Sequence, residues 1–318
     1  MKILDCTLRD GGFVNDFDWD LRFAKRYLEF MSRIKVPIVE LGYWKQNSKS
    51  KNRFYNFNED TLDQIYNGVS TPLDMSIMID YHYCSKKISD YPKNGTTPIN
   101  LVRITSRKED LPKALKFAET LKNKTNLDMA FQIINSTNYT RKELLKTTEI
   151  IAKHDFLYVY FADSHGNLNL NENYDNYRDS VEALRFNGKK VGFHLHNHTG
   201  RALMNYYFCK NNNIDIVDAT ISGLGKGLGN LKLEEIISNE YFPDLIDFII
   251  KNNQHLGDIH LNPYNLISGR ANITDNYAKQ ALKFNPSMSC FNKFVNSLRG
   301  RARDSFDSEL LKIYMDKQ

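Results

Sequence analysis

Residues 194–200 have the sequence HLHNHTG and follow the short apolar run at 190–193, which predicts a strand. Side chains alternate between the two faces of a strand, so we expect His194 and His196 to point the same way. Two imidazoles on one face at a strand end are a suitable pair of ligands for a divalent metal. A helix would need histidines three or four residues apart. The alternative is two half-buried histidines that bond to neighbouring backbone.

Strand and helix patterns alternate along the first 240 residues. We expect strands at 3–8, 37–42, 73–79, 99–104, 127–134, 156–161, 191–195 and 214–221. We expect helices at 21–34, 62–69, 111–121, 141–154, 172–186 and 202–210, with a short one from 233 and the weakest helical pattern at 81–98. Such alternation implies parallel pairing, and about eight units in about 240 residues predict a (β/α)8 TIM barrel. A doubly wound sheet is the alternative.

Beyond residue 240 the pattern is helical only. The expected helices lie at 243–252, 274–284, 288–298 and 309–315. We therefore predict a catalytic barrel over residues 1–240 and a helical C-terminal extension over 241–318. The extension would cover the barrel mouth or form a dimer contact.

The composition of the 318 residues, 41% hydrophobic and 25% charged, is typical of a globular protein. The net charge is +5 without a basic run, which disfavours a nucleic-acid partner and suits a small anionic substrate. The four cysteines form no Cys-x-x-Cys pair, and no apolar run approaches the roughly 18 residues of a membrane span. With no signal-peptide pattern at the N-terminus, we expect a soluble cytoplasmic protein with reduced thiols and no membrane contact.

Polar side chains occupy the predicted carboxyl ends of five strands. In a (β/α)8 barrel, the residues that act on substrates gather at that end. The residues in these places are Arg9, Asp10, Glu40, Asp163, Ser164, His194, His196 and the loop 223–230. One shared site explains this pattern better than five independent buried polar groups do.

Asp10, His194 and His196 would supply one carboxylate and two imidazoles, and Asn230 could add a carbonyl oxygen. This mixed oxygen and nitrogen set suits Mn²⁺, Mg²⁺, Co²⁺ or Zn²⁺. A metal chelated by a 2-oxo acid stabilises an enolate when a carbon–carbon bond forms or breaks. Arg9 is always protonated and could donate to the enolate oxygen. A salt bridge beside a turn is the alternative for Arg9 and Asp10.

The glycine-rich segment 223–230 is expected to form a loop over this site or a simple turn. It is not a P-loop, and Gly-x-Gly-x-x-Gly fits in no register. Its lysine, Lys226, would stay protonated in a loop, and the sixth strand supplies no lysine for a Schiff base. The metal route is therefore favoured.

Three ordered motifs resemble those of the metal-dependent lyases and synthases related to 3-hydroxy-3-methylglutaryl-CoA lyase. They are DCTLRDGG at 5–12, HLHN at 194–197 with Gly200 and Asn205, and GKGLGN at 225–230 with Glu234. ADSHG at 162–166 and VDAT at 217–220 resemble the 4-hydroxy-2-oxovalerate aldolases within that superfamily. The likeness extends over roughly residues 2–240.

The resemblance implies a (β/α)8 barrel, a metal bound by Asp10, His194 and His196 with Asn230 as a further ligand, an enolate stabilised by Arg9, and a homodimer. We assign catalysis to Arg9, Asp10, His165 and Tyr43, and substrate binding to Glu40, Asp163, Ser164 and His198. Mn²⁺ is the first choice of metal, ahead of Mg²⁺, Co²⁺ and Zn²⁺.

Two departures limit the resemblance. The aldolases carry an acid/base histidine shortly after the Arg-Asp-Gly, and Phe13 stands at that position here. Proton transfer would therefore need another group, such as His82, His165, His198 or Tyr43. The aldolase region that docks a dehydrogenase is not evident, and the tail from 262 to 278 is more similar to aldolase-like proteins found among bacterial polysaccharide genes.

The sequence thus predicts a divalent-metal-dependent carbon–carbon lyase that acts on a 2-oxo acid and an aldehyde. An acyl-CoA Claisen-type synthase or lyase is the first alternative, although the loop 223–230 lacks the cysteine that the CoA lyases carry there. The second is a catalytically inactive barrel that binds a metal or ligand, which Phe13 keeps open.

Overall fold

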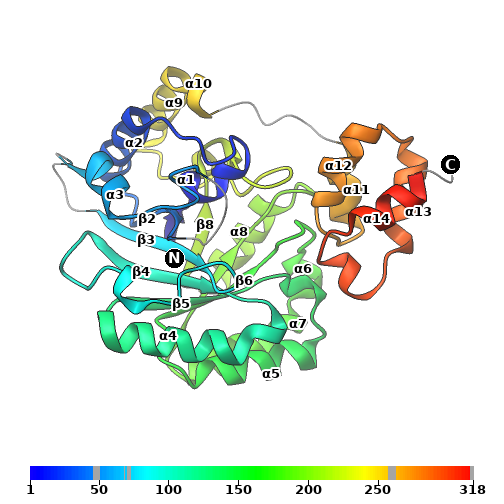
Figure 1. Ribbon diagram of the computed structural model, residues 1–318, viewed down its shortest axis with the longest axis horizontal. Coiled ribbons are helices and arrows are strands. Elements are labelled where there is room, and N and C mark those ends of the chain that lie inside the picture. The colour runs from blue at the N-terminus through cyan, green and yellow to red at the C-terminus, as the bar shows by residue number, and fades with distance from the viewer. Residues whose placement is uncertain (46–50, 68, 70–72, 257–262, 316–318) are drawn as a thin grey trace.

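In the part of the chain that the structure describes, eight apolar runs pair as parallel strands and close into one barrel (Figure 1). This computed structural model describes residues 1–45, 51–67, 69, 73–256 and 263–315. The strands are β1 (Lys2–Asp5), β2 (Ile38–Tyr43), β3 (Asp74–Asp80), β4 (Ile99–Thr105), β5 (Asp128–Ile133), β6 (Tyr158–Ala162), β7 (Lys190–His194) and β8 (Ile216–Ala219). The (β/α)8 prediction is confirmed, and a doubly wound sheet is excluded because β1 pairs with both β2 and β8.

Helices surround the barrel and continue beyond it. Those up to residue 256 are α1 (Thr7–Asp10), α2 (Leu21–Arg33), α3 (Glu59–Tyr66), α4 (Leu111–Thr125), α5 (Arg141–Ala152), α6 (Leu170–Asn173), α7 (Asp175–Phe186), α8 (Ala202–Asn211), α9 (Phe242–Lys251) and α10 (Asn253–Leu256). The later ones are α11 (Pro263–Arg270), α12 (Asn276–Phe284), α13 (Met288–Ser297) and α14 (Ser308–Met315). Short 3-10 turns lie at Gly11–Phe13, Ile88–Asp90, Lys108–Asp110, Ser136–Asn138, Ile221–Gly223, Leu233–Glu235 and Gly300–Arg303. None of the described helices combines the length and hydropathy that a bilayer crossing requires.

Side-chain caps fix where several outer helices begin. The carboxylate of Asp20 accepts the backbone N–H of Phe23 at the start of α2. Thr140 and Glu143 form a reciprocal capping box at the start of α5. Such caps satisfy amide groups that a helix leaves unpaired at its first turn. They therefore fix where the loop from the preceding strand ends and the helix begins.

The first strand is shorter than the pattern at 3–8 predicts. Asp5 ends β1 because its carboxylate accepts the backbone N–H of Thr7 at 2.8 Å and turns the chain into α1. The N–H of Asp10 then bonds to the carbonyl of Cys6. This turn carries Arg9 and Asp10 across the top of the strand. The prediction of strand at Thr7 and Leu8 is therefore wrong.

Other boundaries also differ from the predicted ones. The segment 81–98 forms one 3-10 turn in place of a helix. The helix predicted at 172–186 divides into α6 and α7. The helices α10 and α11 carry no strong amphipathic pattern and were not predicted. The boundary predicted between residues 240 and 241 stays a prediction, although Leu245 and Leu256 pack into the barrel's outer core.

A charged layer crosses the barrel interior. Arg103 of β4 lies with its guanidinium among Glu40 of β2, Asp218 of β8 and the ring of Tyr160 of β6. Alternate strands supply each layer of a (β/α)8 interior, and branched apolar residues usually fill it. An apolar cluster that includes Leu4, Ile38, Leu101, Tyr158 and Ile216 lies in the same interior. The barrel therefore carries ionised groups among its apolar side chains.

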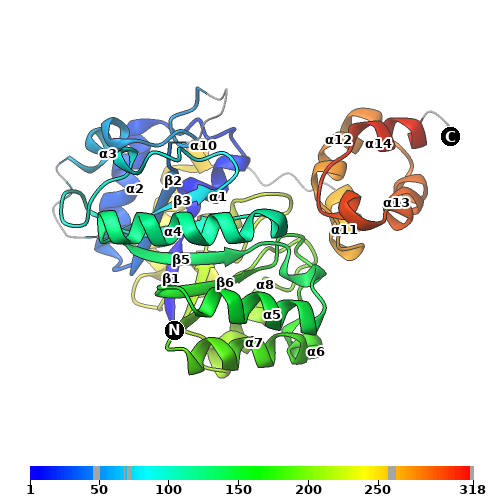
Figure 2. The same ribbon diagram turned by 60° about the horizontal axis from the view of Figure 1, so that its bottom comes forward.

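Helices α11–α14 form a separate cluster with its own apolar core, as Figures 1 and 2 show beside the barrel. Polar contacts join this cluster to the barrel. Asn272 accepts a hydrogen bond from Thr137 at 2.8 Å, and Lys226 Nζ lies 2.6 Å from Asp275 Oδ1. The carboxylate of Asp304 accepts from Asn138. Because these barrel residues follow β5 and β8, the cluster meets the barrel at its mouth.

Asp5 gives the barrel a pH-dependent stability. Burial raises the pKa of its carboxyl to about 6, although hydrogen bonds from Tyr27 and Thr7 oppose the shift. An unfolded chain releases this proton near a pKa of about 3.9, so the free energy of unfolding falls as pH rises from about 4 to 6. Asp5→Asn keeps an oxygen acceptor and cannot ionise. We expect it to raise the free energy of unfolding at pH 8 by about 1–3 kcal/mol.

Urea denaturation of both proteins from pH 4 to pH 8 measures this difference. It should shrink towards pH 4, where both side chains are neutral. A difference that is the same at every pH would contradict the assignment to Asp5.

Candidate metal centre

The strand β7 brings two histidines to the barrel mouth. His194 is its last residue, and His196 continues as a bridge to Asn230. Their Nε2 atoms lie 3.2 Å apart, and both residues are buried. The strand alternation expected from the sequence therefore does place the two rings on one side.

Asp10 completes a three-residue group with this pair. Its Oδ2 lies 3.9 Å from Nε2 of His194, and one ligand atom from each of Asp10, His194 and His196 lies within 4.8 Å of the others. Asn230 donates from Nδ2 to Asp10 Oδ2 at 2.5 Å and to the carbonyl of Leu224 at 3.0 Å. Asn230 thus orients the carboxylate, and its own Oδ1 lacks a hydrogen-bond partner among the described residues.

The donor set fits a divalent cation. Nδ1 of His194 lies 2.8 Å from Asp218 Oδ2, so the carboxylate holds the proton on Nδ1 and leaves the lone pair of Nε2 towards His196 and Asp10. His196 Nδ1 has no hydrogen-bond partner in the described part of the chain. Two converging imidazole nitrogens beside a carboxylate are the ligands that Zn²⁺, Mn²⁺ and related ions take.

The protonation states also suit a metal. Burial would raise the pKa of Asp10, but the Arg9 guanidinium and then the two histidines outweigh it and hold the pKa below its usual range. Burial lowers the pKa of His196 well below that of a free imidazole. At neutral pH Asp10 is therefore ionised and His196 neutral, which are the states that bind metal.

A chain of alternating charges links the metal group across the barrel, and its members are buried. Arg9 donates from Nη1 to Asp10 and from Nε to Glu40 Oε2 at 2.6 Å. Arg103 donates from Nη1 to Glu40 Oε1 at 3.2 Å and from Nη2 to Asp218 Oδ2 at 2.6 Å. Three carboxylates against two guanidiniums leave a net charge of −1 beside His194 and His196, which favours a bound cation.

Arg103 and the role of Asp218 were missed by sequence reasoning. A single signal was present, because Arg103 is the one charged residue in the apolar run of β4 at 99–105 and has the phase of an inward-facing side chain. Asp218 likewise occupies an inward-facing position in β8, but the residues that it contacts are far away in sequence. Only the closed barrel brings Arg103 and Asp218 together.

The residues predicted to bind substrate make internal hydrogen bonds. Both carboxylate oxygens of Glu40 accept from arginines. Asp163 Oδ1 accepts the N–H groups of Asn167 and Leu168, and burial raises the pKa of this carboxyl. Ser164 Oγ accepts the N–H of Asn135 at 2.9 Å. Their contact with substrate stays a prediction.

The proposed proton-transfer groups lie on two sides of the metal group. The ring of His198 is 5.1 Å from that of His196, and its Nε2 is 3.0 Å from the carbonyl of Lys226. His165 Nδ1 lies 3.1 Å from Asn272 Oδ1, and burial lowers the pKa of His165 to about 4. On the other side, the Arg9 guanidinium lies 5.9 Å from the ring of Tyr43.

Phe13 forms an aromatic wall where the aldolases carry a histidine. Its ring packs edge-on against Phe17 at 5.0 Å and Tyr43 at 6.4 Å. Burial raises the pKa of Tyr43, which therefore keeps its proton at neutral pH. Tyr43 therefore contributes a protonated hydroxyl to this aromatic wall, and its ring faces Arg9.

The glycine-rich loop packs directly on the metal group. A Cβ added at Gly225 would lie 2.2 Å from Asn230 Nδ2 and 2.7 Å from Asp10 Oδ2. Both distances are far below normal contact, so only glycine allows the backbone this close. The loop therefore closes over the pair that Asp10 and Asn230 form.

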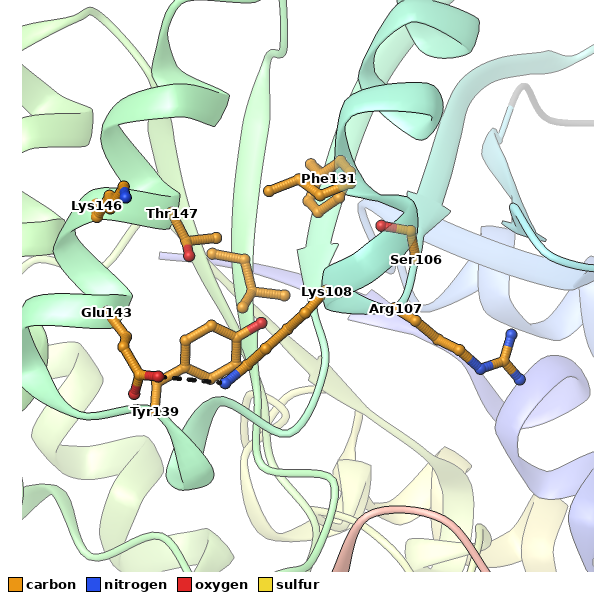
Figure 3. Close-up of a pocket in the computed structure, with 10 residues that line it drawn as sticks. Ser106, Arg107, Lys108, Phe131, Tyr139, Glu143, Lys146 and Thr147 are labelled. Carbon is orange, nitrogen blue, oxygen red and sulfur yellow. Dashed lines mark ion pairs between the residues drawn. The ribbon is translucent and has the colours of Figure 1, made fainter. Parts of the chain in front are cut away.

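A separate cavity of about 160 Å³ lies between α4 and α5, outside the barrel wall (Figure 3). Leu111, Phe131 and Ile133 line it, and Lys108 pairs with Glu143 at 4.0 Å across it. No residue of the metal group contributes to its lining. The chemistry described above therefore belongs to the barrel mouth.

Comparison with known proteins shows which proteins this chain is similar to. A family model described as HMGL-like matches residues 93–249. A 2-isopropylmalate synthase from Geobacillus sp. (strain Y412MC10) is 25% identical over 249 residues, which cover 74% of this chain and 46% of that protein. A 4-hydroxy-2-oxovalerate aldolase from Thermus thermophilus is 24% identical over 243 residues, which cover 73% of this chain and 66% of that one.

A solved structure shares the fold. The carboxyl transferase domain from Rhizobium etli pyruvate carboxylase with pyruvate and biocytin matches with a TM-score of 0.72 at 13% identity, covering 100% of this chain and 61% of that chain. The chain spans about half the length of the isopropylmalate synthases that it matches. The resemblance to the HMG-CoA lyase-like superfamily, with its metal-dependent lyases and synthases, is confirmed.

Removing one histidine tests the metal centre. We expect His196→Ala to lower the affinity for Mn²⁺ at least 100-fold, because it deletes one of three converging ligands while outer partners alone contribute about 10–100-fold. Electron paramagnetic resonance of free Mn²⁺ measures the affinity. His82→Ala, which changes an exposed histidine, is the control. Equal Mn²⁺ affinity in folded His196→Ala and wild type would rule out this site.

Proposed function

We propose that the protein is a divalent-metal-dependent carbon–carbon lyase that acts on a 2-oxo acid in the aldol or retro-aldol direction. The observation that carries the proposal is the buried group of Asp10, His194 and His196 beside the guanidinium of Arg9. The similarity to the 4-hydroxy-2-oxovalerate aldolase supports it. A 4-hydroxy-2-oxo acid, with pyruvate as its enolate-forming half and an aldehyde as the partner, is the proposed substrate.

Each side chain near the metal has a defined task. A metal held by Asp10, His194 and His196, with Asn230 as a further oxygen ligand, supplies Lewis acidity towards the oxygens of a 2-oxo acid. Nη2 of Arg9 is buried and has no hydrogen-bond partner among the described residues, so it is free to donate to the developing enolate oxygen. Burial opposes the charge of Arg9, but Asp10 and Glu40 outweigh it and raise its pKa.

The proton has two proposed carriers. His165 is neutral at neutral pH because its pKa lies near 4, and a neutral imidazole can accept a proton. Tyr43 keeps its hydroxyl proton and can donate it from the Arg9 side. These two groups would replace the histidine that the aldolases carry where Phe13 stands.

We further propose Mn²⁺ as the metal, a homodimer as the assembly and the cytoplasm as the location. Mn²⁺ accepts the mixed set of carboxylate oxygen, amide oxygen and imidazole nitrogen without demanding a strict geometry. Glu40, Asp163, Ser164 and His198 remain the proposed substrate-binding residues at the mouth.

A Claisen-type reaction on an acyl-CoA is the second candidate function. The similarity to 2-isopropylmalate synthases favours it, since those matches cover about three quarters of this chain. An inactive metal-binding barrel is the third, because Phe13, where the aldolases carry a histidine, is a half-buried apolar residue that packs against Phe17 and Tyr43. Both alternatives predict Mn²⁺ binding without turnover of a 4-hydroxy-2-oxo acid.

Deuterium exchange tests the enolate directly. We expect Mn²⁺-dependent exchange of the pyruvate methyl protons in D₂O, followed by NMR. Arg9→Lys keeps the buried charge but loses the bidentate fork, and we expect it to slow exchange about 10²–10³-fold, as loss of one oxyanion donor does. Arg178→Ala, on the outer surface of α7, is the control.

The result separates the three candidate functions. No exchange in a folded, Mn²⁺-loaded protein would exclude pyruvate as the nucleophile. Exchange of acetyl-CoA methyl protons would then support the Claisen reaction. Mn²⁺ binding without exchange on any 2-oxo acid or thioester would support the inactive barrel.

A further inference from the structure

Arg103 is an unusual residue for the inside of a barrel. Its side chain is fully buried in β4, and burying an unpaired guanidinium costs several kcal/mol. A guanidinium is cationic and does not bind a metal ion, so Arg103 is not a ligand beside Asp10, His194 and His196. Its charge is retained there because carboxylates approach it from two directions.

Arg103 is connected to the metal group through Asp218. Nη2 of Arg103 donates to Asp218 Oδ2 at 2.6 Å, and the same oxygen lies 2.8 Å from Nδ1 of His194. A metal-binding histidine keeps its useful tautomer when its other nitrogen donates to a fixed carboxylate. Arg103 holds that carboxylate in place.

Arg103 is connected to the proposed enolate site through Glu40. Nη1 of Arg103 donates to Glu40 Oε1 at 3.2 Å, and Glu40 Oε2 accepts from Nε of Arg9 at 2.6 Å. Glu40 therefore cannot shift towards Arg9 without loosening its bond to Arg103. The orientation of Arg9 Nη2 depends on this arrangement.

Two further contacts fix the guanidinium itself. Gln132 Oε1 accepts from Nη2 at 2.6 Å, and the ring of Tyr160 lies 4.3 Å from Cζ. The planar fork of arginine reaches Glu40 and Asp218 at once, whereas the ammonium of lysine is a single point charge. Lysine at this position could hold one carboxylate well but not both.

We propose that Arg103 is a positioning residue that orients two parts of the site without touching either. Through Asp218 it aims Nε2 of His194 at the metal, and through Glu40 it aims Arg9 at the substrate. The second half rests on the proposed function, whereas the first requires only that the centre binds a metal. A residue that merely balances buried charge would leave both orientations unchanged.

Two variants and a matched control test the proposal. Arg103→Met removes the charge at similar length, and Arg103→Lys keeps it. The control is Arg141→Met, because Arg141 also pairs with a carboxylate through two hydrogen bonds, to Asp179 at 2.7 and 2.8 Å, but on the outer surface. Arg141→Met therefore also loses an arginine–carboxylate ion pair, but one that lies outside the barrel.

The first readout is affinity for Mn²⁺. We expect Arg103→Met to weaken binding about 10–100-fold, as loss of an outer partner does, with Arg103→Lys intermediate and Arg141→Met unchanged. Asp218→Asn should weaken binding too, and its effect should not add to that of Arg103→Met, since both act through one carboxylate. Additive effects, or wild-type affinity in folded Arg103→Met, would overturn the first half.

The second readout needs no metal and no activity. Nitrogen-15 NMR of histidine-labelled apoprotein reports which ring nitrogen of His194 carries the proton, with the signal assigned by its absence in His194→Ala. We expect Nδ1–H in the wild type and a mixture with Nε2–H in Arg103→Met. An unchanged tautomer would show that Asp218 holds His194 alone. If Arg103→Met does not fold, the same measurements on Arg103→Lys are compared with those on the wild type.

The third readout separates this inference from the proposed function. In pyruvate exchange we expect Arg103→Lys to lower kcat more than it raises KM. A misoriented Arg9 would stabilise the enolate less, whereas the binding of pyruvate would change little. Wild-type kcat in Arg103→Lys, with exchange intact in the wild type, would overturn the Glu40 half. Absence of exchange in the wild type would refute the proposed function, and the tautomer and Mn²⁺ measurements would still decide the role of Arg103 at His194.

Discussion

The structure depends on one line of alternating charges buried inside the barrel. From Asp10 it passes through Arg9, Glu40 and Arg103 to Asp218, and it ends on His194. Arg9, Glu40 and Arg103 each have an opposite charge on both sides, which repays part of the cost of removing ions from water. Replacing one member by an apolar residue would leave two neighbours uncompensated. These residues therefore act as a single unit, and together they fix the orientations of Asp10 and His194 at the two ends.

The sequence was enough to predict the barrel and the grouping of Asp10, His194 and His196 at the ends of its strands. Alternating strands and helices indicated eight parallel units, and the strand-end rule drew attention to Arg9, Asp10, His194 and His196 together. These signals are local, because each depends on a few neighbouring residues. The first strand was predicted too long because the Asp5 side chain bonds to the backbone of Thr7 and ends the strand. Propensity alone could not indicate this bond.

The interior partners could not be predicted in the same way. Arg103 and Asp218 are 115 residues apart, and each sits in an otherwise apolar strand. Their pairing exists only because β4 and β8 face one another across a closed barrel. The contact of Asn272 with Thr137 and His165 was also hidden, as it joins the C-terminal cluster to two loops. Long-range pairings of this kind follow from topology and leave little trace in a local pattern.

The bond between Asn230 and Asp10 joins residues 220 positions apart. They meet because β8 pairs with β1, the step that turns an open sheet into a ring. Pairings this distant in sequence close a long loop of chain, and this closure costs conformational entropy. A cation that binds only the assembled group stabilises the closed ring over every open form, and this stabilisation grows with the logarithm of the cation's concentration. The ion would thus stabilise the closed barrel as well as take part in the reaction. The free energy of unfolding would then depend on the concentration of free metal around the protein.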